Sequence, residues 1–357
     1  MALFLIMSIN TIDIVDYTLC RHRPVKGGTA ATYLFSSLFI SKPHRPQIAY
    51  YFTMDSSHLR DWPASLLPLP EASQLAVAPP EPAAGYWSGA PSAVVGDDGI
   101  YLAYRLRRPV GAGRGYAVNV ARSTDGVHFE TLLTITREQF AADSLERPAL
   151  VRGPDGRWRL YVSCATPGTK HWRVELLEAG HPAGFEPARR EVVLPGDAKT
   201  GVKDPVIRWD DGIWQLWASC HPLADPGEAD QMVTNYATSA DGLDWTWHGT
   251  ALAGRPGCWD ARGTRVAAII TRSGGTIAAF YDGRASAAEN YEERTGIATG
   301  TEPSALTAYG TGPAAQSAHA GGGLRYLDVL PLPDGRYRLY YELTRADGAH
   351  ELRTELR

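Results

Sequence analysis

One repeated pattern constrains the fold of this chain more than any other feature. It joins a proline, a short apolar run, an Asp-Gly turn and a second, aromatic-rich run. The pattern occurs in Gly89–Tyr104 (GAPSAVVGDDGIYLAY), Leu145–Cys164 (LERPALVRGPDGRWRLYVSC) and Gly201–Cys220 (GVKDPVIRWDDGIWQLWASC). Two apolar runs around an Asp-Gly turn are typical of a β-hairpin. Its prolines follow one another at intervals of 57 residues, at Pro91, Pro148 and Pro205.

Two weaker copies of the hairpin pattern follow, in Asp260–Phe280 and Leu324–Tyr341, which makes five units from about Gly85 to the C-terminus. A fixed period of this size indicates a repeat architecture, and in a β-rich chain it favours a propeller with one four-stranded blade per repeat. The sequence therefore predicts an all-β fold, a five-bladed β-propeller of four-stranded antiparallel blades over residues 85–357.

Residues 1–84 differ from the repeats. The apolar stretch ALFLIM is short, no basic residue precedes it and no small-residue cleavage site follows, so a secretory signal fits poorly. Because the segment from Met54 reads like a natural N-terminus, we expect 1–53 to be a poorly ordered extension or a mis-assigned start. An added strand or helix packed on the propeller is the alternative. Residues 63–84, rich in Pro and Ala, are expected to be an extended lead-in over the surface.

Charge and composition exclude several classes of partner. The net charge is −4 and no dense basic run occurs, which argues against nucleic acid. A membrane span needs about 18 apolar residues, and no apolar stretch approaches that length. We expect a cytoplasmic protein. None of the four cysteines forms a CxxC pair. Cys164 and Cys220 end equivalent runs of adjacent repeats, so we expect buried thiols rather than a disulfide framework.

The prolines also suggest where chemistry takes place. The first strand of a propeller blade lines the central axis and is a sheet edge, which tolerates proline. Residues just before the prolines are therefore expected to surround one mouth of an axial funnel. These are Gly89-Ala90, Glu146-Arg147, Lys203-Asp204, Asp260 with Arg262 and Arg265, and Tyr326 with Asp328. Convergent carboxylates suit glycoside hydrolysis, in which one acid protonates the leaving oxygen and one carboxylate acts as base or nucleophile.

The candidate catalytic residues are Glu146, Asp204 and Asp260. Asp204 is expected to position the substrate and tune a neighbour's pKa, and Glu146 and Asp260 to share the acid and base roles. Ion pairs that fix the blades together are the structural alternative for each of them. The candidate substrate-binding residues are Trp87, Arg147, Trp259, Arg262, Asp282, Arg284, Tyr326 and Asp328. Arginines hold hydroxyls or anionic groups, and aromatic side chains offer faces to a sugar ring.

With these motifs the chain resembles the five-bladed propeller glycosidases, the arabinanase, β-xylosidase and invertase superfamily, with the mannoside phosphorylases as cousins. KDPVIRWDDGIWQLW is similar to the segment that carries the superfamily's middle aspartate, which implies that role for Asp204. The segment around Asp260 falls where the family places its general acid. The last blade, AHAGGGLRYLDVLPLPDGRYRLYYE, resembles that of arabinanase-like members, which implies an axial metal ion such as calcium near His319. No other cofactor is expected.

The chain also departs from that family. Those glycosidases carry a catalytic aspartate before the first-blade proline, where this sequence has Ala90. Mannoside phosphorylases lack that carboxylate too and use phosphate, but their second-blade motif is of the Glu-Asp-Pro-Arg type, and here it reads Glu146-Arg147-Pro148. The expected function is hydrolysis of a small glycan or glycoside. An inverting glycoside phosphorylase and a non-catalytic carbohydrate-binding propeller are the alternatives.

Overall fold

The computed structural model describes residues 7–8, 11–12 and 63–357, except 226, 273 and 320. The chain divides into two units, Met1–Leu59 and Arg60–Arg357. In the first unit, β1 (Met7–Ser8) pairs antiparallel with β2 (Thr11–Ile12). The other expectations for residues 1–53 fall outside the described residues. The second unit contains the repeats.

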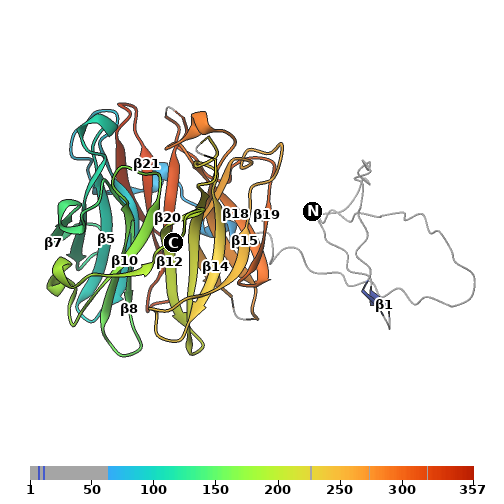
Figure 1. Ribbon diagram of the computed structural model, residues 1–357, viewed down its shortest axis with the longest axis horizontal. Coiled ribbons are helices and arrows are strands. Elements are labelled where there is room, and N and C mark those ends of the chain that lie inside the picture. The colour runs from blue at the N-terminus through green and yellow to red at the C-terminus, as the bar shows by residue number, and fades with distance from the viewer. Residues whose placement is uncertain (1–6, 9–10, 13–62, 226, 273, 320) are drawn as a thin grey trace, which may run out of the picture. The chain divides into compact units, whose positions relative to one another are not determined.

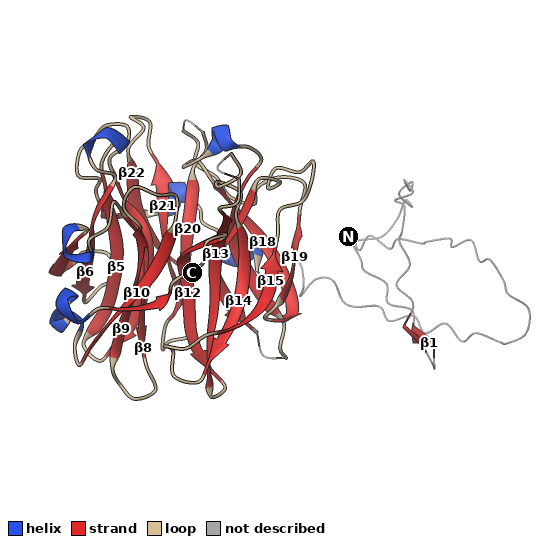
Figure 2. Cartoon of the chain, in the orientation of Figure 1, coloured by secondary structure: helices blue, strands red, loops and turns tan. Residues whose placement is uncertain are grey.

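The second unit is built from antiparallel strands, with short 3-10 helices in the connections (Figures 1 and 2). The second repeat forms a sheet of β8 (Leu145–Arg152), β9 (Trp158–Ala165), β10 (Trp172–Ala179) and β11 (Glu191–Leu194). The third forms a sheet of β12 (Thr200–Asp210), β13 (Ile213–Pro222), β14 (Val233–Ser239) and β15 (Thr246–Leu252). The fourth forms a sheet of β16 (Gly263–Thr271), β17 (Ile277–Arg284), β18 (Arg294–Glu302) and β19 (Ala305–Tyr309). The all-β prediction is confirmed.

The first and last repeats share one eight-stranded sheet. The first repeat contributes β4 (Trp87–Gly96), β5 (Gly99–Arg107), β6 (Gly115–Ser123) and β7 (Glu130–Thr136). The last repeat contributes β20 (Leu324–Pro331), β21 (Tyr337–Thr344) and β22 (His350–Leu356), and β3 (Gln74–Val77) pairs with β22. A single parallel residue pair, His350 with Trp87, joins the two halves. Residues 74–77, expected as a surface lead-in, therefore supply a strand to the last sheet from upstream of the predicted boundary at Gly85.

The first strands of the repeats pack against one another in a closed ring. β4 contacts β8, β8 contacts β12, β12 contacts β16, β16 contacts β20, and β20 contacts β4. In the three four-stranded sheets the first strand is an edge of its sheet, as the prolines predict. This arrangement brings equivalent positions of the repeat to a common axis.

Every first strand is interrupted by a β-bulge at the same position. The register shifts between Gly89 and Ser92 in β4 and between Lys203 and Val206 in β12, with equivalent shifts in β8, β16 and β20. Three bulge residues adopt left-handed backbone angles, with φ of 53° at Ala90, 53° at Asp204 and 54° at Tyr326. Bulges re-aim side chains, and left-handed angles in non-glycine residues cluster at functional sites.

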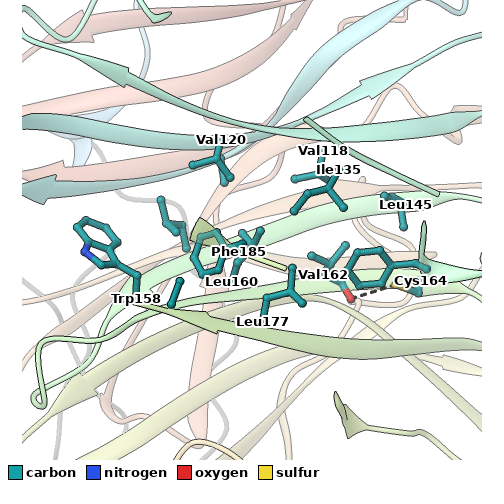
Figure 3. Close-up of a cluster of buried hydrophobic side chains, with 14 of the residues drawn as sticks. Val118, Val120, Ile135, Leu145, Trp158, Leu160, Val162, Cys164, Leu177 and Phe185 are labelled. Atoms are coloured by element: carbon teal, nitrogen blue, oxygen red, sulfur yellow. Dashed lines mark hydrogen bonds between the residues drawn. The ribbon is translucent and has the colours of Figure 1, made fainter. Parts of the chain in front are cut away.

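Apolar side chains fill the spaces between neighbouring sheets. Figure 3 shows one such cluster, in which Val118 and Val120 of β6 meet Leu160 and Val162 of β9. Cys164 belongs to this cluster and Cys220 to the next one, and both are buried free thiols, as the sequence predicts. Cys20 lies outside the described residues.

The two Ser-x-Asp-Gly turns tie sheets together. In each turn the serine hydroxyl accepts the backbone N–H of the glycine at 2.8 Å, in Ser123–Gly126 and again in Ser239–Gly242. The carbonyl of Gly126 then accepts a hydrogen bond from Tyr340, and that of Gly242 accepts one from Tyr161, both at 2.9 Å. Tyr340 and Tyr161 each lie on the second strand of a neighbouring repeat. The two turns therefore link adjacent repeats, which is a structural role.

Candidate functional site

A pocket of ≈ 290 Å³ opens where the first strands approach their bulges, and we call it the funnel pocket. Glu146 of β8, Lys203 of β12, Arg265 of β16 and Arg325 of β20 all line it. Lys203 and Arg325 lie directly before the register shifts of their strands, Arg265 lies one residue further from its shift, and Glu146 lies within the shift of β8, so all four are at or beside a bulge. The repeat therefore brings these residues from four different groups of strands to one site.

The bulges divide the predicted ring between two cavities. A second cavity, of ≈ 360 Å³, is lined by residues that follow the bulges, and we call it the rear cavity. Arg147 and Asp328 line the rear cavity, whereas Glu146 and Tyr326 line the funnel pocket. Adjacent residues thus serve different cavities, which the sequence pattern does not distinguish.

Glu146 is held ionised in the wall of the funnel pocket. Its Oε2 accepts a hydrogen bond from Arg105 at 2.5 Å, and its Oε1 lies 3.8 Å from Arg107. Burial alone raises the pKa of Glu146, but Arg105, Lys203 and Arg107 outweigh that effect and hold the pKa below its usual value. Glu146 is therefore suited to the role of a base or nucleophile and not to that of an acid.

Asp204 is fully buried beneath the same pocket. Its Oδ2 lies 3.2 Å from both Lys203 and Arg265, and the Tyr326 hydroxyl donates to it at 3.5 Å, while Oδ1 has no hydrogen-bond partner. Burial raises the pKa of Asp204, yet Lys203 and Arg265 outweigh it and keep the carboxylate ionised. The pair with Arg265 joins two neighbouring repeats, as the structural alternative for this residue expects.

A chain of buried ion pairs includes part of the pocket wall. Glu342 of β21 accepts from Arg105 at 2.6 Å and from Arg325 at 2.7 Å, and Arg325 continues to Glu293 at 2.6 Å. Glu293 in turn accepts from Arg284 at 2.5 Å. All five side chains are nearly or fully buried, so each charge depends on its neighbours for compensation.

The same chain of charges includes Asp282, a predicted substrate-binding residue that does not line the funnel pocket. Asp282 accepts from Arg265 at 2.8 Å and from the backbone N–H of Tyr326 at 2.9 Å. Burial raises the pKa of Asp282 against the pull of Arg265. Asp282 therefore holds Arg265 and the left-handed bulge at Tyr326 in place.

Apart from Asp282, sequence reasoning missed the inward-facing residues of the second strands. Their signal is the end of each aromatic-rich run, because the five runs align as LAYR, LYVS, LWAS, AFYD and LYYE. The final residues of these runs are Arg105, Ser163, Ser219, Asp282 and Glu342. Four of these residues face residues that line the funnel pocket: Ser219 pairs with Lys203, Asp282 with Arg265 and Glu342 with Arg325, and Ser163 lies opposite Glu146. The fifth, Arg105, pairs with Gly89. Aligning the repeats over both strands, and not only at the proline, identifies them.

Glycine at position 89 follows from this packing. The other pre-bulge residues carry long side chains, but a Cβ on Gly89 would lie 1.9 Å from Oε2 of Glu342. The Glu342 carboxylate thus occupies the space of the missing side chain while it pairs with Arg105.

We expect Gly89→Ala to lower the free energy of unfolding by about 1–3 kcal/mol, because the methyl group must displace a buried, paired carboxylate. Gly111→Ala is the matched control, since nothing lies within 4 Å of its Cβ position, and its effect should stay within about 0.5 kcal/mol. Urea unfolding of both variants makes the comparison. Equal stability of the two variants would show that Glu342 moves aside at no cost.

Several predicted residues lie away from the funnel pocket. Asp260 is fully buried, but it does not line the pocket, and its carboxylate accepts from Arg255 at 2.9 Å and from Tyr281 at 2.7 Å. Trp259 stacks on Tyr281, with ring centroids 5.7 Å apart. Arg262 pairs with Glu228 and Asp230. The structure thus gives these three residues contacts that hold the loop before β16 and does not bring them to the pocket.

Trp87 lies next to the pocket and not in its wall. Its ring stacks on His350 with centroids 4.3 Å apart, and the guanidinium of Arg107 lies 3.9 Å from its centroid. Arg284, by contrast, does line the pocket.

His319 is exposed in the loop before β20. Within the described ranges, no group of three or more His, Cys, Asp or Glu side chains could hold a metal ion. The expected calcium ion near His319 stays a prediction. No described helix is long and apolar enough to cross a membrane.

The rear cavity contains a titratable carboxyl. Burial raises the pKa of Asp328 to about 6, against the opposing effect of Arg147, and its Oδ2 accepts the backbone N–H of Ala93 at 2.7 Å. Arg147 is fully buried with Nε and Nη1 unpartnered, and its Nη2 donates to the Ala267 carbonyl. The two side chains share the cavity without a direct ion pair within 4 Å.

This raised pKa predicts a pH-dependent effect of Asp328→Asn. Between about pH 4 and pH 6, Asp328 is protonated in the folded protein and ionised in the unfolded chain. The contribution of Asp328 to stability is therefore present in full below about pH 4 and is lost as the pH rises through about 6. Asparagine imitates the protonated form. The variant should therefore gain stability relative to the wild type, by up to about 3 kcal/mol, between pH 4 and pH 7.

Thermal or urea unfolding at the two pH values measures that gain. Asp334→Asn is the control, because the exposed Asp334 has a pKa lowered by Arg336 and its effect should have the opposite sign. A gain for Asp328→Asn that does not change with pH would contradict the raised pKa.

The fold has known counterparts among solved structures. A glycosyl hydrolase from Bacteroides ovatus matches with a TM-score of 0.57 and 16% identity over 80% of this chain and 95% of that one. The GH43_1 enzyme from Xanthomonas citri, solved with xylotriose, matches with a TM-score of 0.56 and 16% identity over 79% of this chain and 90% of that one.

A third structure comes from work on the GH130 family of mannoside phosphorylases, which contains glycoside hydrolases that target β-1,2 mannosidic linkages in Candida mannan. It matches with a TM-score of 0.54 and 17% identity, over 75% of this chain and 83% of that one. The resemblance to the propeller glycosidase superfamily is confirmed at the level of the fold, with no single subfamily matched. No family model matches the sequence, and no curated protein matches it either.

Proposed function

We propose that this chain is a five-bladed β-propeller enzyme that hydrolyses a glycoside in the funnel pocket. The observation that carries the proposal is the convergence of Glu146, Arg265 and Tyr326, from three different groups of strands, on one cavity beside the bulges. A carboxylate at the axis of such a fold can act as the base or nucleophile of glycoside cleavage, and a guanidinium and a phenol can hold sugar hydroxyls. The carbohydrate-processing neighbours of the same fold support this reading.

Glu146 is the base or nucleophile of the proposed reaction, since its pKa is lowered and it lines the pocket. Tyr326 is a hydrogen-bond donor to the sugar. Burial raises the pKa of its phenol and the carboxylates of Asp204 and Glu146 raise it further, against Arg265, so the phenol carries its proton at neutral pH. Asp204 positions Tyr326 through the contact at 3.5 Å.

An inverting glycoside phosphorylase is the second candidate, and one observation favours it. Ala90 and Asp204 both precede a proline in a bulge and share a φ of 53°, so they are equivalent positions of the repeat. The first repeat thus offers a methyl group where the third offers a carboxylate. A reaction in which phosphate replaces activated water does not need that carboxylate.

Turnover by the purified full-length chain on aryl-glycosides and short oligosaccharides, with and without phosphate, tests both candidates. Release of the aryl group without phosphate supports hydrolysis, and strict phosphate dependence supports the phosphorylase. Sugar binding without turnover of any substrate would contradict both and favour a carbohydrate-binding propeller.

A further inference from the structure

The charge of the funnel pocket is opposite to that of the protein. The chain has a net charge of −4, yet the residues lining the pocket include seven Lys or Arg against three Asp or Glu. His221, which also lines it, adds no charge at neutral pH, because burial lowers its pKa to about 3, with Lys203 acting in the same direction. The pocket therefore carries an excess of positive charge in a mostly buried setting, where charge interactions are strong.

Among the buried cations of the pocket wall, Arg107 has the least compensation. It is 2% exposed, its nearest carboxylate oxygen, on Glu146, lies 3.8 Å away, and its Nε has no hydrogen-bond partner. The other oxygen of Glu146 is occupied by Arg105 at 2.5 Å. Burial lowers the pKa of Arg107 despite the attraction of Glu146, so its charge is held at a cost that an added anion relieves.

Aromatic rings hold the Arg107 guanidinium in place. It lies 3.9 Å from the ring centroid of Trp87 and 4.2 Å from that of Tyr291. Burial by itself raises the pKa of the Tyr291 phenol, but Arg107 outweighs burial and lowers it. Although Tyr291 is 36% exposed, the lowered pKa of its phenol is consistent with the cations on this side of the pocket, Arg107 and Arg114.

Further cations surround the same side. Arg114 and Lys203 approach the ring of Trp172, with their charged groups 5.6 and 4.9 Å from its centroid. Among the described residues no carboxylate lies within 4 Å of the Arg114 guanidinium, which is half-buried at the start of β6. Lys203 shares its partner Asp204 with Arg265. Arg107, Arg114 and Lys203 together make an oxyanion site beside Glu146, and we call it the cationic wall.

We propose that the substrate of this enzyme is an anionic glycoside, whose sugar carries a carboxylate, sulfate or phosphate group that the cationic wall binds. This proposal rests on the proposed function and names the substrate class for the same pocket. Guanidinium groups bind such oxyanions through paired N–H donors, and Arg107 has an unused donor and a fixed orientation. The bound anion also takes over the partner role for Arg107, while Glu146 keeps its hydrogen bond from Arg105.

Binding of single sugars to the full-length protein, followed by calorimetry, tests the proposal without requiring turnover. The probes are glucuronic acid, galacturonic acid, glucose 6-sulfate and glucose 6-phosphate, each beside its neutral parent, with inorganic phosphate as a separate arm. At least one anionic sugar should bind about tenfold or more tightly than its neutral parent. That preference should weaken as NaCl is raised from about 0.05 to 0.5 M.

Variants assign the binding to the cationic wall. Arg107→Gln should weaken the favoured anionic sugar about tenfold and change binding of the neutral parent less than about twofold. Arg114→Gln tests the same wall at a half-buried position, should Arg107→Gln fail to fold. Arg336→Gln is the matched control, because Arg336 lies in an exposed turn and pairs with Asp334. This variant should change the affinity for neither the anionic sugar nor its neutral parent.

The results separate this proposal from the proposed function. The anionic-substrate proposal is overturned if no anionic sugar binds more tightly than its parent, or if inorganic phosphate alone binds as tightly as the sugar-borne anions. The latter result assigns the wall to free phosphate. Tight, Arg107-dependent binding of an anionic sugar without turnover of any glycoside upholds the anion site and contradicts the glycosidase. Equal turnover of neutral and anionic glycosides upholds the glycosidase and contradicts the anion site.

Discussion

Glu342→Gln is expected to lower the free energy of unfolding by about 3–5 kcal/mol, although it adds and removes almost no volume. Glu342 is fully buried and accepts from Arg105 at 2.6 Å, Arg325 at 2.7 Å and His350 at 2.7 Å. Burial raises the pKa of Glu342, but Arg325 and Arg105 lower it much further, so the folded protein holds the charged form. Neutralising it leaves two buried guanidinium groups short of a counter-charge.

A surface pair provides the control for that variant. Glu186 and Arg189 form an ion pair whose side chains are 59% and 78% exposed. Glu186→Gln should therefore cost no more than about 1 kcal/mol. Urea unfolding of both variants at neutral pH and fixed ionic strength gives the two free energies. If Glu342→Gln is as mild as Glu186→Gln, the buried network does not stabilise the axis of the fold.

Glu146→Gln is expected to reduce kcat on a turned-over glycoside by about 10²–10⁴-fold, the usual contribution of a positioned acid or base. The amide keeps the shape of the side chain and can still accept from Arg105, but it cannot take a proton or attack the sugar. A substrate-binding role alone would raise KM with a smaller change in kcat. The split between kcat and KM therefore tests the catalytic role, on the substrate that the panel identifies.

Asp260→Asn is the counterpart of this variant. The sequence places Asp260 among the candidate catalytic carboxylates, but in the structure it is bonded to Arg255 and Tyr281 and does not line the funnel pocket. We expect its kcat to stay within about twofold of the wild type while its unfolding free energy falls by about 3 kcal/mol or more. Loss of turnover in Asp260→Asn with kcat preserved in Glu146→Gln would reverse the two assignments.

The buried charges have a clear relation to the repeat. Successive groups of strands present Arg105, Asp282 and Glu342 at one position of the second strand. Arg265 and Arg325 occupy the matching position of the first strand in the fourth and fifth repeats. Because the first strands close a ring, charges of opposite sign meet across neighbouring groups. The network is therefore a consequence of packing similar repeats with different residues at equivalent positions.

Much of the fold could be predicted because its signals are local. Asp211 and Gly212 adopt positive φ values of 48° and 81°, which a two-residue hairpin turn of this kind requires. The spacing of Pro91, Pro148 and Pro205 fixes the period, and the prolines lie in first strands, at or beside bulges. Local backbone preference and alternation of apolar residues determine these features, so they can be predicted from the sequence alone.

The closing strand was not predictable in the same way. β3 lies before the first repeat and pairs with β22 of the last one, in which Leu352 is opposite Val77. A segment as short as QLAV, following Pro and Ser residues, has no hairpin partner nearby in the sequence. The edge of β22 that β3 joins exists only once the last repeat has packed beside the first one.

The sequence by itself determined the repeat, the strand pairs within each repeat and the position at which polar side chains reach the axis, because a period and a hairpin depend on neighbouring residues. The tertiary structure decided which polar residues meet. It placed Glu146 beside Arg107 in one cavity and Arg147 in another, bonded Asp260 away from the pocket, and gave the space at Gly89 to Glu342. The reason is that a bulge turns adjacent side chains in different directions, and the partner of a buried charge comes from a different repeat.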